Sequence, residues 1–353
     1  MIKIAALTSG KNTPSSRYRI RQHIALLKKA GIDISEFYPC VEKYSSMPEK
    51  QELFCKKHHI DSEKWWIRLK KTDRLYGFLS SFFYDIVWLE RVMIPRYKSF
   101  ELKLKHPVIF DSDDAIWLNE GLVFTNEIAK HADKVFAGNS FIADWFSQYN
   151  KNVIIVPTAI DISKHKPHDN FKRDKFIIGW TGLSSNFFYL KLIEKPLKKF
   201  LTKYNDSYLS IISDAYPTEL AIPKSQMIFN KWSQNNDFDI IKDFVVGIMP
   251  LKDDEWVKGK CSFKMLQYMA AAKPVIVSPF GMNKQILGEV ECGIGAVTDD
   301  DWYTSLEYVY KNESLYNSFG NNGLKLIKEK YCLEIVNKTI TKQIKELHYD
   351  FRK

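Results

Sequence analysis

The sequence has no long hydrophobic run, no closely paired cysteines and no dinucleotide-binding glycine motif. No apolar stretch reaches the roughly 18–20 residues that cross a bilayer, and the N-terminus lacks the apolar segment of a signal peptide. We therefore expect a cytoplasmic protein. The 5 cysteines are scattered without a C-x-x-C pair, which indicates reduced thiols and no metal site.

The positive charge of the chain lies in its first third. Residues 1–106 contain 21 Lys and Arg against 11 Asp and Glu, whereas residues 107–353 contain 31 of each. A basic surface attracts nucleic acid, an anionic membrane surface or a phosphorylated substrate, although charge of this kind can also serve solubility alone. Since no nucleic-acid recognition motif accompanies the charge, we expect no nucleic-acid partner.

Short apolar segments alternate with amphipathic ones along the chain, a pattern typical of parallel sheets covered by helices. The series starts afresh after a polar segment, so we predict an α/β protein with two Rossmann-like, doubly wound domains facing a cleft. The predicted parts are an N-terminal domain (1–157), a linker (158–175), a C-terminal domain (176–330) and a last helix (331–353) that packs back on the N-terminal domain. The helical pattern of the last part is expected to break near Tyr331.

Ligands of such sheets bind beyond the carboxyl ends of the strands. The loop after the first strand carries Ser15, Ser16, Arg17 and Arg19 at the start of a helix. Helix-start amides and guanidinium groups favour anions, so this loop is a candidate anion site. The alternative is that Ser15 or Ser16 caps the helix and that the arginines face water.

Three carboxylates, Asp111, Asp113 and Asp114, follow the predicted strand "VIFD". Carboxylates this close repel one another unless they bind a cation, a sugar hydroxyl or an arginine. Side chains alternate along an extended segment, which predicts that Asp111 and Asp113 share one face and Asp114 takes the other. One of the three is also a candidate cap for a helix near Ala115.

The second half offers two candidate phosphate-binding segments. Gly179 and Gly182 flank a strand end, where the lack of a side chain lets a ligand approach the backbone. Lys260 and Lys264 precede and open a helix predicted at 263–272. Because the first helical turn favours acids, lysines there indicate a bound anion such as a diphosphate; the alternative is that both reach into solvent.

Gln267 lies on the same helical face as Lys264, where its amide can bond a ribose hydroxyl. Segment 56–105 mixes basic residues with Trp65, Trp66, Phe82 and Phe83. This mixture is typical of an interfacial membrane contact, unless the aromatic residues belong to the core. If segment 56–105 contacts a membrane, we expect the protein to lie peripherally on the inner face of the cell membrane.

These segments resemble retaining glycosyltransferases of the GT-B fold, specifically glycosyltransferase family four and its subgroup active on bacterial surface polysaccharides. The resemblance is carried, in the family's order, by residues 15–32, 87–95, 108–117, 134–146, 152–161, 177–190 and 244–287. It implies a nucleotide diphosphate sugar as donor substrate, no metal or other cofactor, and a glycan or lipid-linked glycan as acceptor. Possible alternatives are a sugar-nucleotide epimerase of the same fold and an inactive glycosyltransferase-like binding partner.

The resemblance also implies roles for individual residues. Catalysis falls to Asp113 and Asp114, which stand closest to a histidine that many relatives have in the first domain. Ser16, Arg17 and Arg19 would bind the acceptor; Gly182, Lys260, Lys264, Gln267 and Asp253 would bind the donor. The pattern departs from the family at Gly259 and Gln267, where most relatives have a pair of glutamates. A contact to the donor sugar would then come from Asp253, Asp254 or Glu255.

Overall fold

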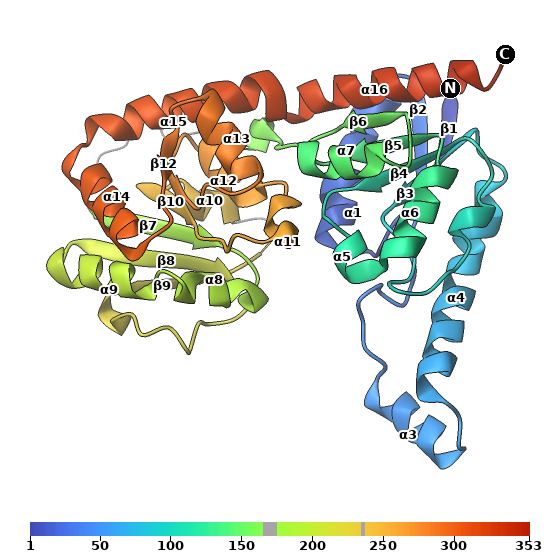
Figure 1. Ribbon diagram of the computed structural model, residues 1–353, viewed down its shortest axis with the longest axis horizontal. Coiled ribbons are helices and arrows are strands. Elements are labelled where there is room, and N and C mark those ends of the chain that lie inside the picture. Colours follow the sequence, from blue (N-terminus) through green and yellow to red (C-terminus); the bar gives the residue numbers. More distant parts are fainter. Residues whose placement is uncertain (165–174, 234–236) are drawn as a thin grey trace. The chain divides into compact units, whose positions relative to one another are not determined.

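The computed structural model describes residues 1–164, 175–233 and 237–353 (Figure 1). The chain divides into two compact units. Unit 1 comprises Met1–Ala159 together with Leu333–Lys353, and unit 2 comprises Ile160–Cys332. Of the linker expected at 158–175, residues 165–174 lie outside the described part of the chain.

Unit 1 is built on a six-stranded parallel sheet in the order β2-β1-β3-β4-β5-β6. The strands are β1 (Ile2–Leu7), β2 (Ile32–Phe37), β3 (Ile86–Glu90), β4 (Val108–Ser112), β5 (Lys134–Ala137) and β6 (Val153–Ile155). The strands β3, β4 and β5 are buried along their whole length, as expected for central strands covered by helices on both faces.

The helices of unit 1 are α1 (Pro14–Arg19), α2 (Ile24–Lys29), α3 (Glu49–Lys57), α4 (Ser62–Ser81), α5 (Trp117–Glu120), α6 (Leu122–His131), α7 (Ser140–Ser147) and α16 (Leu333–Asp350). In Figure 1, α3 and the lower part of α4 project from the sheet. One core cluster joins strand residues such as Trp88 and Phe136 to Val336, Ile340 and Ile344 of α16. The last helix of the chain is therefore part of the unit 1 core.

The helical path of the C-terminal segment is interrupted before α16. Residues Ile327–Tyr331 form a turn of π-helix, and Cys332 then takes an extended backbone conformation (φ −73°, ψ 153°). The α-helix resumes at Leu333, which lies in the other unit. Within unit 1, Asn337 of α16 lies 3.3 Å from the ring nitrogen Nδ1 of His23.

Unit 2 has its own six-stranded parallel sheet, in the order β12-β11-β10-β7-β8-β9. The strands are β7 (Phe176–Thr181), β8 (Ser207–Ser213), β9 (Met227–Lys231), β10 (Val246–Met249), β11 (Val275–Val277) and β12 (Gly293–Gly295). The helices are α8 (Phe187–Lys191), α9 (Glu194–Lys203), α10 (Asp237–Ile241), α11 (Glu255–Lys258), α12 (Phe263–Ala270), α13 (Met282–Glu289), α14 (Asp299–Lys311) and α15 (Ser314–Leu326).

One predicted helix of unit 2 is divided. The segment expected as a helix over 187–204 forms α8 and α9, with a break at Ile193 (φ −116°, ψ 15°). Pro196 falls in the first turn of α9, where its missing N–H costs nothing. A proline in the middle of one continuous helix would remove a backbone hydrogen bond, which explains why the helix starts anew there.

None of the helices in the described part of the chain combines the length and the apolar content that a bilayer crossing requires. The two doubly wound sheets, each with helices on its faces, give the α/β architecture that the sequence predicts.

Candidate functional site

The candidate donor site of unit 2 lies where the direction of strand addition reverses. The strand β7 has β8 on one side and β10 on the other, so the connections after β7 and β10 leave the sheet in different directions. Ligands of doubly wound sheets bind beyond the carboxyl ends of the strands at this point. Gly182 directly follows β7, and the segment from Leu251 to Asp254 follows β10.

Helix α12 begins at this edge with an unusual backbone conformation. Its N-cap, Ser262, is buried and has left-handed dihedral angles (φ 50°, ψ 27°), which a residue with a side chain adopts at an energetic cost. The first turn then consists of Phe263, Lys264 and Met265. This arrangement aims helix-start amides and a lysine at the same edge of the sheet, where they favour a bound anion.

Lys264 is partly buried, and its ammonium group lies over an aromatic ring and beside a glycine. Its Nζ lies 4.6 Å from the centre of the Trp180 ring. Burial, and then the positive charge of Lys260, lower the pKa of Lys264 to about 7. Within the described residues, no carboxylate forms an ion pair with this ammonium group. Its charged form is therefore destabilised in the free protein, and an anion at this place would stabilise it.

Gly182 and Gly179 have different roles. A Cβ atom at position 182 would lie 2.8 Å from Lys264 Nζ and 2.7 Å from the Trp180 ring, so glycine leaves room for the ammonium group. A Cβ atom at position 179 would lie only 1.8 Å from the ring of Phe244. The interpretation that Gly179 admits a ligand is wrong, because a core phenylalanine fills that space.

Lys260 and Gln267 complete this part of the site. Lys260 is partly buried, and its Nζ lies 5.1 Å from the centre of the Trp256 ring. Gln267, one turn after Lys264, is 8% exposed, and its side-chain amide makes no hydrogen bond within the described residues. With no partner in the described part of the chain, this amide is available to a ligand hydroxyl.

The acidic residues upstream of α11 are arranged differently. Asp253 is exposed and lies 3.7 Å from Lys258 Nζ on α11. Asp254 is the N-cap of that helix and accepts a hydrogen bond of 2.8 Å from the backbone N–H of Val257. Asp254 thus has a structural role as a helix cap. Asp253, which is exposed, is the better placed of the two to bind a ligand.

A hollow of about 350 Å³ lies beside this region, at the carboxyl ends of β7 and β8. Ser184, Phe188 and Tyr216 are among the residues that line it. Asp214 accepts hydrogen bonds from the backbone N–H and the hydroxyl of Ser184, at 2.6 and 2.9 Å, and so fixes the loop after β7.

In unit 1, Asp113 and Asp114 both bind one arginine. The guanidinium group of Arg91 lies 2.6 Å from Asp113 Oδ1 and 2.5 Å from Asp114 Oδ2. The prediction that Asp114 takes the face opposite Asp113 was wrong, because β4 ends at Ser112, strand alternation stops there and both side chains reach the same guanidinium group. Burial opposes ionisation of Asp113, but the charges of Arg91 and Arg19 hold its pKa below the usual value.

Arg91 itself has a left-handed backbone (φ 56°), which turns the chain at the end of β3. The N-cap of helix α5 is Ile116, and no side chain caps this helix. The alternative that one of the three aspartates is a helix cap is therefore wrong.

Asp111 belongs to a separate, buried ion pair with Arg19. Arg19 Nε donates to Asp111 Oδ1 at 2.9 Å, and Arg19 Nη1 donates to the backbone oxygen of Val156 at 2.6 Å. Burial raises the pKa of Asp111 to about 6, and Arg19 partly offsets this effect. Arg19 therefore ties β4 to the segment after β6.

Ser16 lies inside α1, whose N-cap is Thr13, so the helix-capping alternative for Ser15 and Ser16 is wrong. The hydroxyl of Ser16 donates to Glu90 Oε2 at 2.8 Å and accepts from the Ser9 backbone N–H at 3.2 Å. Arg17 is partly exposed, with its guanidinium group 5.0 Å from the centre of the Tyr18 ring.

Sequence reasoning missed Trp180, Arg91 and Glu90. Trp180 could have been predicted, because it lies two residues before Gly182 and side chains two residues apart in a strand point to the same face. No local pattern marks the other two. Within the described residues, no group of three or more His, Cys, Asp or Glu side chains is placed to hold a metal ion.

No protein-family model and no curated protein sequence matches the chain. Solved structures do match, several of them over nearly the whole chain. Sucrose-phosphate synthase from Thermosynechococcus elongatus superposes with a TM-score of 0.69 at 11% identity, covering 99% of this chain and 100% of that one. Anabaena HepE in complex with UDP and glucose gives a TM-score of 0.65 at 12% identity, covering 98% of this chain and 100% of that one.

A glycosyltransferase from Rickettsia africae gives a TM-score of 0.67 at 11% identity, covering 98% of both chains. These structures are GT-B glycosyltransferases, and the likeness shows that this chain has the same two-domain α/β fold.

Proposed function

We propose that this protein is a glycosyltransferase that moves a sugar, with retention, from a nucleotide diphosphate sugar to a glycan or lipid-linked glycan in bacterial surface polysaccharide synthesis. The observation that carries the proposal is Lys264: a partly buried ammonium group, without an acidic partner in the described residues, at a helix start beyond the carboxyl end of β7. Such a group is stabilised by the phosphates of a donor.

The same group suits the chemistry of the transfer. Breaking the bond between sugar and diphosphate leaves negative charge on the phosphate oxygen, and cations held in place beforehand stabilise that charge. Lys264, assisted by Lys260 and the amides of the first turn of α12, would do so. Gln267 would bind a ribose hydroxyl, and Asp253 a hydroxyl of the donor sugar.

A uridine nucleotide is the donor class we favour. HepE, whose fold this chain shares, was solved with UDP, with UDP and glucose, and with UDP-glucose. The resemblance of segment 244–287 to retaining enzymes supports retention. In unit 1, the charge of Arg91 lowers the pKa of Asp113, which suits this carboxylate to stabilise positive charge on the sugar rather than to donate a proton, and Asp114 pairs with the same guanidinium group. Ser16, Arg17 and Arg19 would shape the acceptor side.

We further propose that α3 and α4 touch an anionic membrane surface that carries the acceptor. Leu75, Leu79, Phe82 and Phe83 are exposed along and just after α4, and Phe83 is 85% exposed. Trp65 and Trp66 are partly buried, whereas Phe82 and Phe83 are exposed. The alternative that the aromatic residues of this segment belong to the core is therefore wrong for Phe82 and Phe83. Exposed basic residues lie on α3 and the first half of α4, among them Lys56, Lys57, Lys64 and Arg68, and complement anionic lipids.

The Lys264→Ala variant tests the donor site. Loss of a charge-assisted bond to the diphosphate is expected to weaken UDP binding by roughly 2 kcal/mol or more, about a factor of thirty, in calorimetry. The control variant is Lys284→Ala, which removes an exposed lysine of α13. It should bind UDP as the unchanged protein does.

Unchanged UDP affinity in Lys264→Ala, or failure of the unchanged protein to bind UDP or GDP, would contradict the proposal. Transfer to an acceptor extract from labelled UDP-sugars then separates a transferase from a binding protein that has lost activity.

A further inference from the structure

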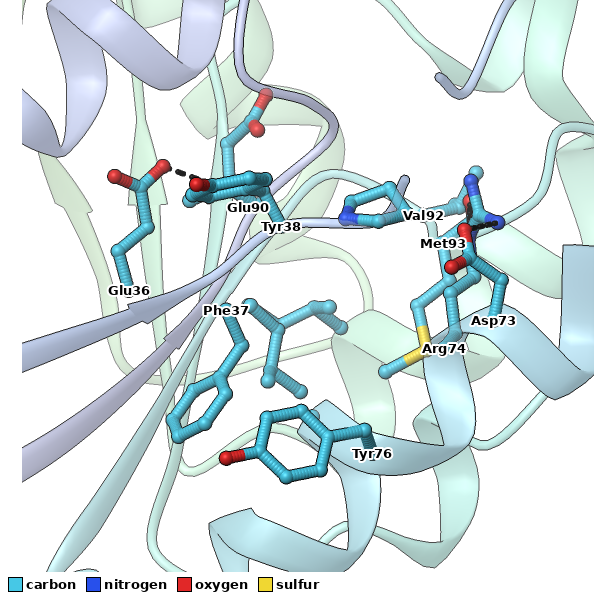
Figure 2. Close-up of a pocket in the computed structure, with 14 residues that line it drawn as sticks. Glu36, Phe37, Tyr38, Asp73, Arg74, Tyr76, Glu90, Val92 and Met93 are labelled. Atoms are coloured by element: carbon cyan, nitrogen blue, oxygen red, sulfur yellow. Dashed lines mark hydrogen bonds and ion pairs between the residues drawn. The ribbon is translucent and has the colours of Figure 1, made fainter. Parts of the chain in front are cut away.

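One side of α4 holds the backbone of segment 40–45. Asp73 accepts hydrogen bonds from two successive N–H groups of this segment, at 3.2 and 2.8 Å. Lys70 donates to two of its backbone oxygens at 2.9 Å, and Arg74 donates to a third at 3.3 Å. Figure 2 shows Asp73 and Arg74 next to each other, beside a pocket lined by α4 and by β1, β2 and β3. Because the three residues share one side of the helix, they fix the path of the segment together.

The segment places Lys43 against Glu120, the last residue of α5. Lys43 Nζ donates to Glu120 Oε2 at 2.7 Å, and the two residues are only 1% and 4% exposed. A buried carboxylate is costly unless its oxygens accept hydrogen bonds. Lys43 serves one of the two oxygens, so Glu120 Oε1 needs a second donor.

The hydroxyl of Tyr44 stands between Glu120 and Arg91. It donates to Glu120 Oε1 at 2.5 Å and accepts from Arg91 Nη1 at 3.3 Å. Burial of the hydroxyl raises the pKa of Tyr44 above its usual value, so the group keeps the proton that it donates. A hydroxyl can donate and accept at the same time, which is what these two neighbours require.

Arg91 has more than one carboxylate within reach. Burial opposes its charge, but Asp113 and Asp114 raise the pKa of the guanidinium group, and Glu120 adds to this effect. Without the Tyr44 hydroxyl, Glu120 Oε1 would be a buried carboxylate oxygen without a donor, which is costly. It would then compete for Arg91. The hydroxyl prevents this competition and leaves the guanidinium group to the two aspartates.

The charge of Asp113 depends on this arrangement. Burial opposes its ionisation, and among the charges that favour ionisation Arg91 contributes more than Arg19 of α1. The orientation of Arg91 therefore controls both the charge and the position of the Asp113 carboxylate. The other titratable groups around the pair are Lys43, Tyr44, Glu90, Asp111, Asp114 and Glu120.

We propose that Tyr44 is a positioning residue for the proposed transfer. Its hydroxyl satisfies Glu120 and thereby holds Arg91 on the two aspartates. The proposal rests on the proposed function, which assigns Asp113 and Asp114 to the reacting sugar. It adds that a tyrosine presented by the segment on α4 fixes the orientation of both carboxylates.

The test follows the ionisation of Asp113 in the full chain without any ligand. Carbon NMR of protein labelled at the aspartate carboxyl groups gives the titration, and the Asp113→Asn spectrum assigns the signal. In Tyr44→Phe the midpoint of Asp113 is expected to rise by about one pH unit or more, because Arg91 turns toward Glu120. Tyr38→Phe, which removes the hydroxyl of another half-exposed tyrosine nearby in the sequence, should leave the midpoint unchanged.

A double variant distinguishes positioning from a general loosening of the structure. Tyr44→Phe combined with Glu120→Gln removes the competing charge, and the amide oxygen can still accept from Lys43. The midpoint of Asp113 should then return toward that of the unchanged protein. The proposal is overturned if Tyr44→Phe leaves the midpoint where it was, if Tyr38→Phe raises it equally, or if the double variant does not lower it.

UDP titrations of the same samples report on the proposed function separately, since the donor site lies in unit 2. Tyr44→Phe should bind UDP as the unchanged protein does, while transfer from a labelled UDP-sugar to an acceptor extract should fall several-fold. Absence of UDP binding in the unchanged protein would count against the proposed function. An unmoved Asp113 midpoint would count against the role of Tyr44 alone.

Discussion

At the scale of single residues, Lys264 links the donor chemistry to pH. Its ammonium group lies over Trp180 and close to Gly182, and its pKa of about 7 means that about half of these groups are neutral near pH 7 in the free protein. A bound diphosphate favours the charged form and therefore raises this pKa.

UDP binding should accordingly take up protons near pH 7. The affinity is expected to be highest below the pKa of the free protein and to fall as the pH rises above 7, because the neutral amine must then be protonated to bind. Calorimetry in buffers of different ionisation enthalpy measures this uptake.

The Lys264→Arg variant is the matched control, because arginine keeps its charge throughout this range. It should show little proton uptake. Equal uptake in both proteins would assign the titrating group elsewhere.

The residue scale also shows where sequence patterns stop. The lysines at the start of a helix were visible because helix propensity and the preference of the first turn for acids are local properties. The partners of Asp113 and Asp114 were not, because Arg91 lies 22 and 23 residues away along the chain and meets them only across β3 and β4.

At the scale of elements, α4 is a helix with two kinds of surface. Its buried residues, including Gly77 and Arg74, pack against the rest of unit 1, whereas Arg68, Leu75 and Leu79 are exposed at spacings of 7 and 4 residues. Such spacing places them on one side of the helix. This side, followed by Phe83, is the proposed membrane contact.

Co-sedimentation with vesicles that contain phosphatidylglycerol tests this contact. Binding is expected at low salt and should decrease as salt is added, because exposed charges are screened. Replacing Leu79 and Phe83 together by serine should weaken binding roughly tenfold or more, given about 1.5–3 kcal/mol for each large apolar side chain that is fully buried.

Serine at Val297 and Tyr308, which are 57% and 51% exposed in unit 2, gives the matched control. No binding to anionic vesicles at low salt, or equal loss in the control, would refute a membrane role for α4.

At the scale of the whole molecule, the chain returns to its first unit at the end. After Cys332 it enters α16, whose Val336, Ile340 and Ile344 are buried in the core of unit 1. Unit 1 is thus completed by residues that follow unit 2 in the sequence. Its stability should depend on a helix more than 170 residues beyond Ala159.

The Ile340→Ala variant tests this dependence. Ile340 is 1% exposed, and its truncation is expected to lower the free energy of unfolding of unit 1 by about 2–5 kcal/mol, since a cavity remains in the core. Hydrogen exchange of the β1 and β3 amides measures the effect. Lys342→Ala, on the exposed side of α16, should change the exchange little, and equal protection in both variants would contradict the assignment.

The sequence by itself determined the alternation of strands and helices, the two doubly wound sheets, the lysine-bearing start of α12 and the interruption near Tyr331. Each of these follows from periodicity and from residue preferences over a few neighbouring positions. Only the tertiary structure decided that Arg91 holds Asp113 and Asp114, that Phe244 fills the space at Gly179, and that the Ser16 hydroxyl donates to Glu90. Those outcomes depend on the packing of segments far apart in the chain, which local patterns do not encode.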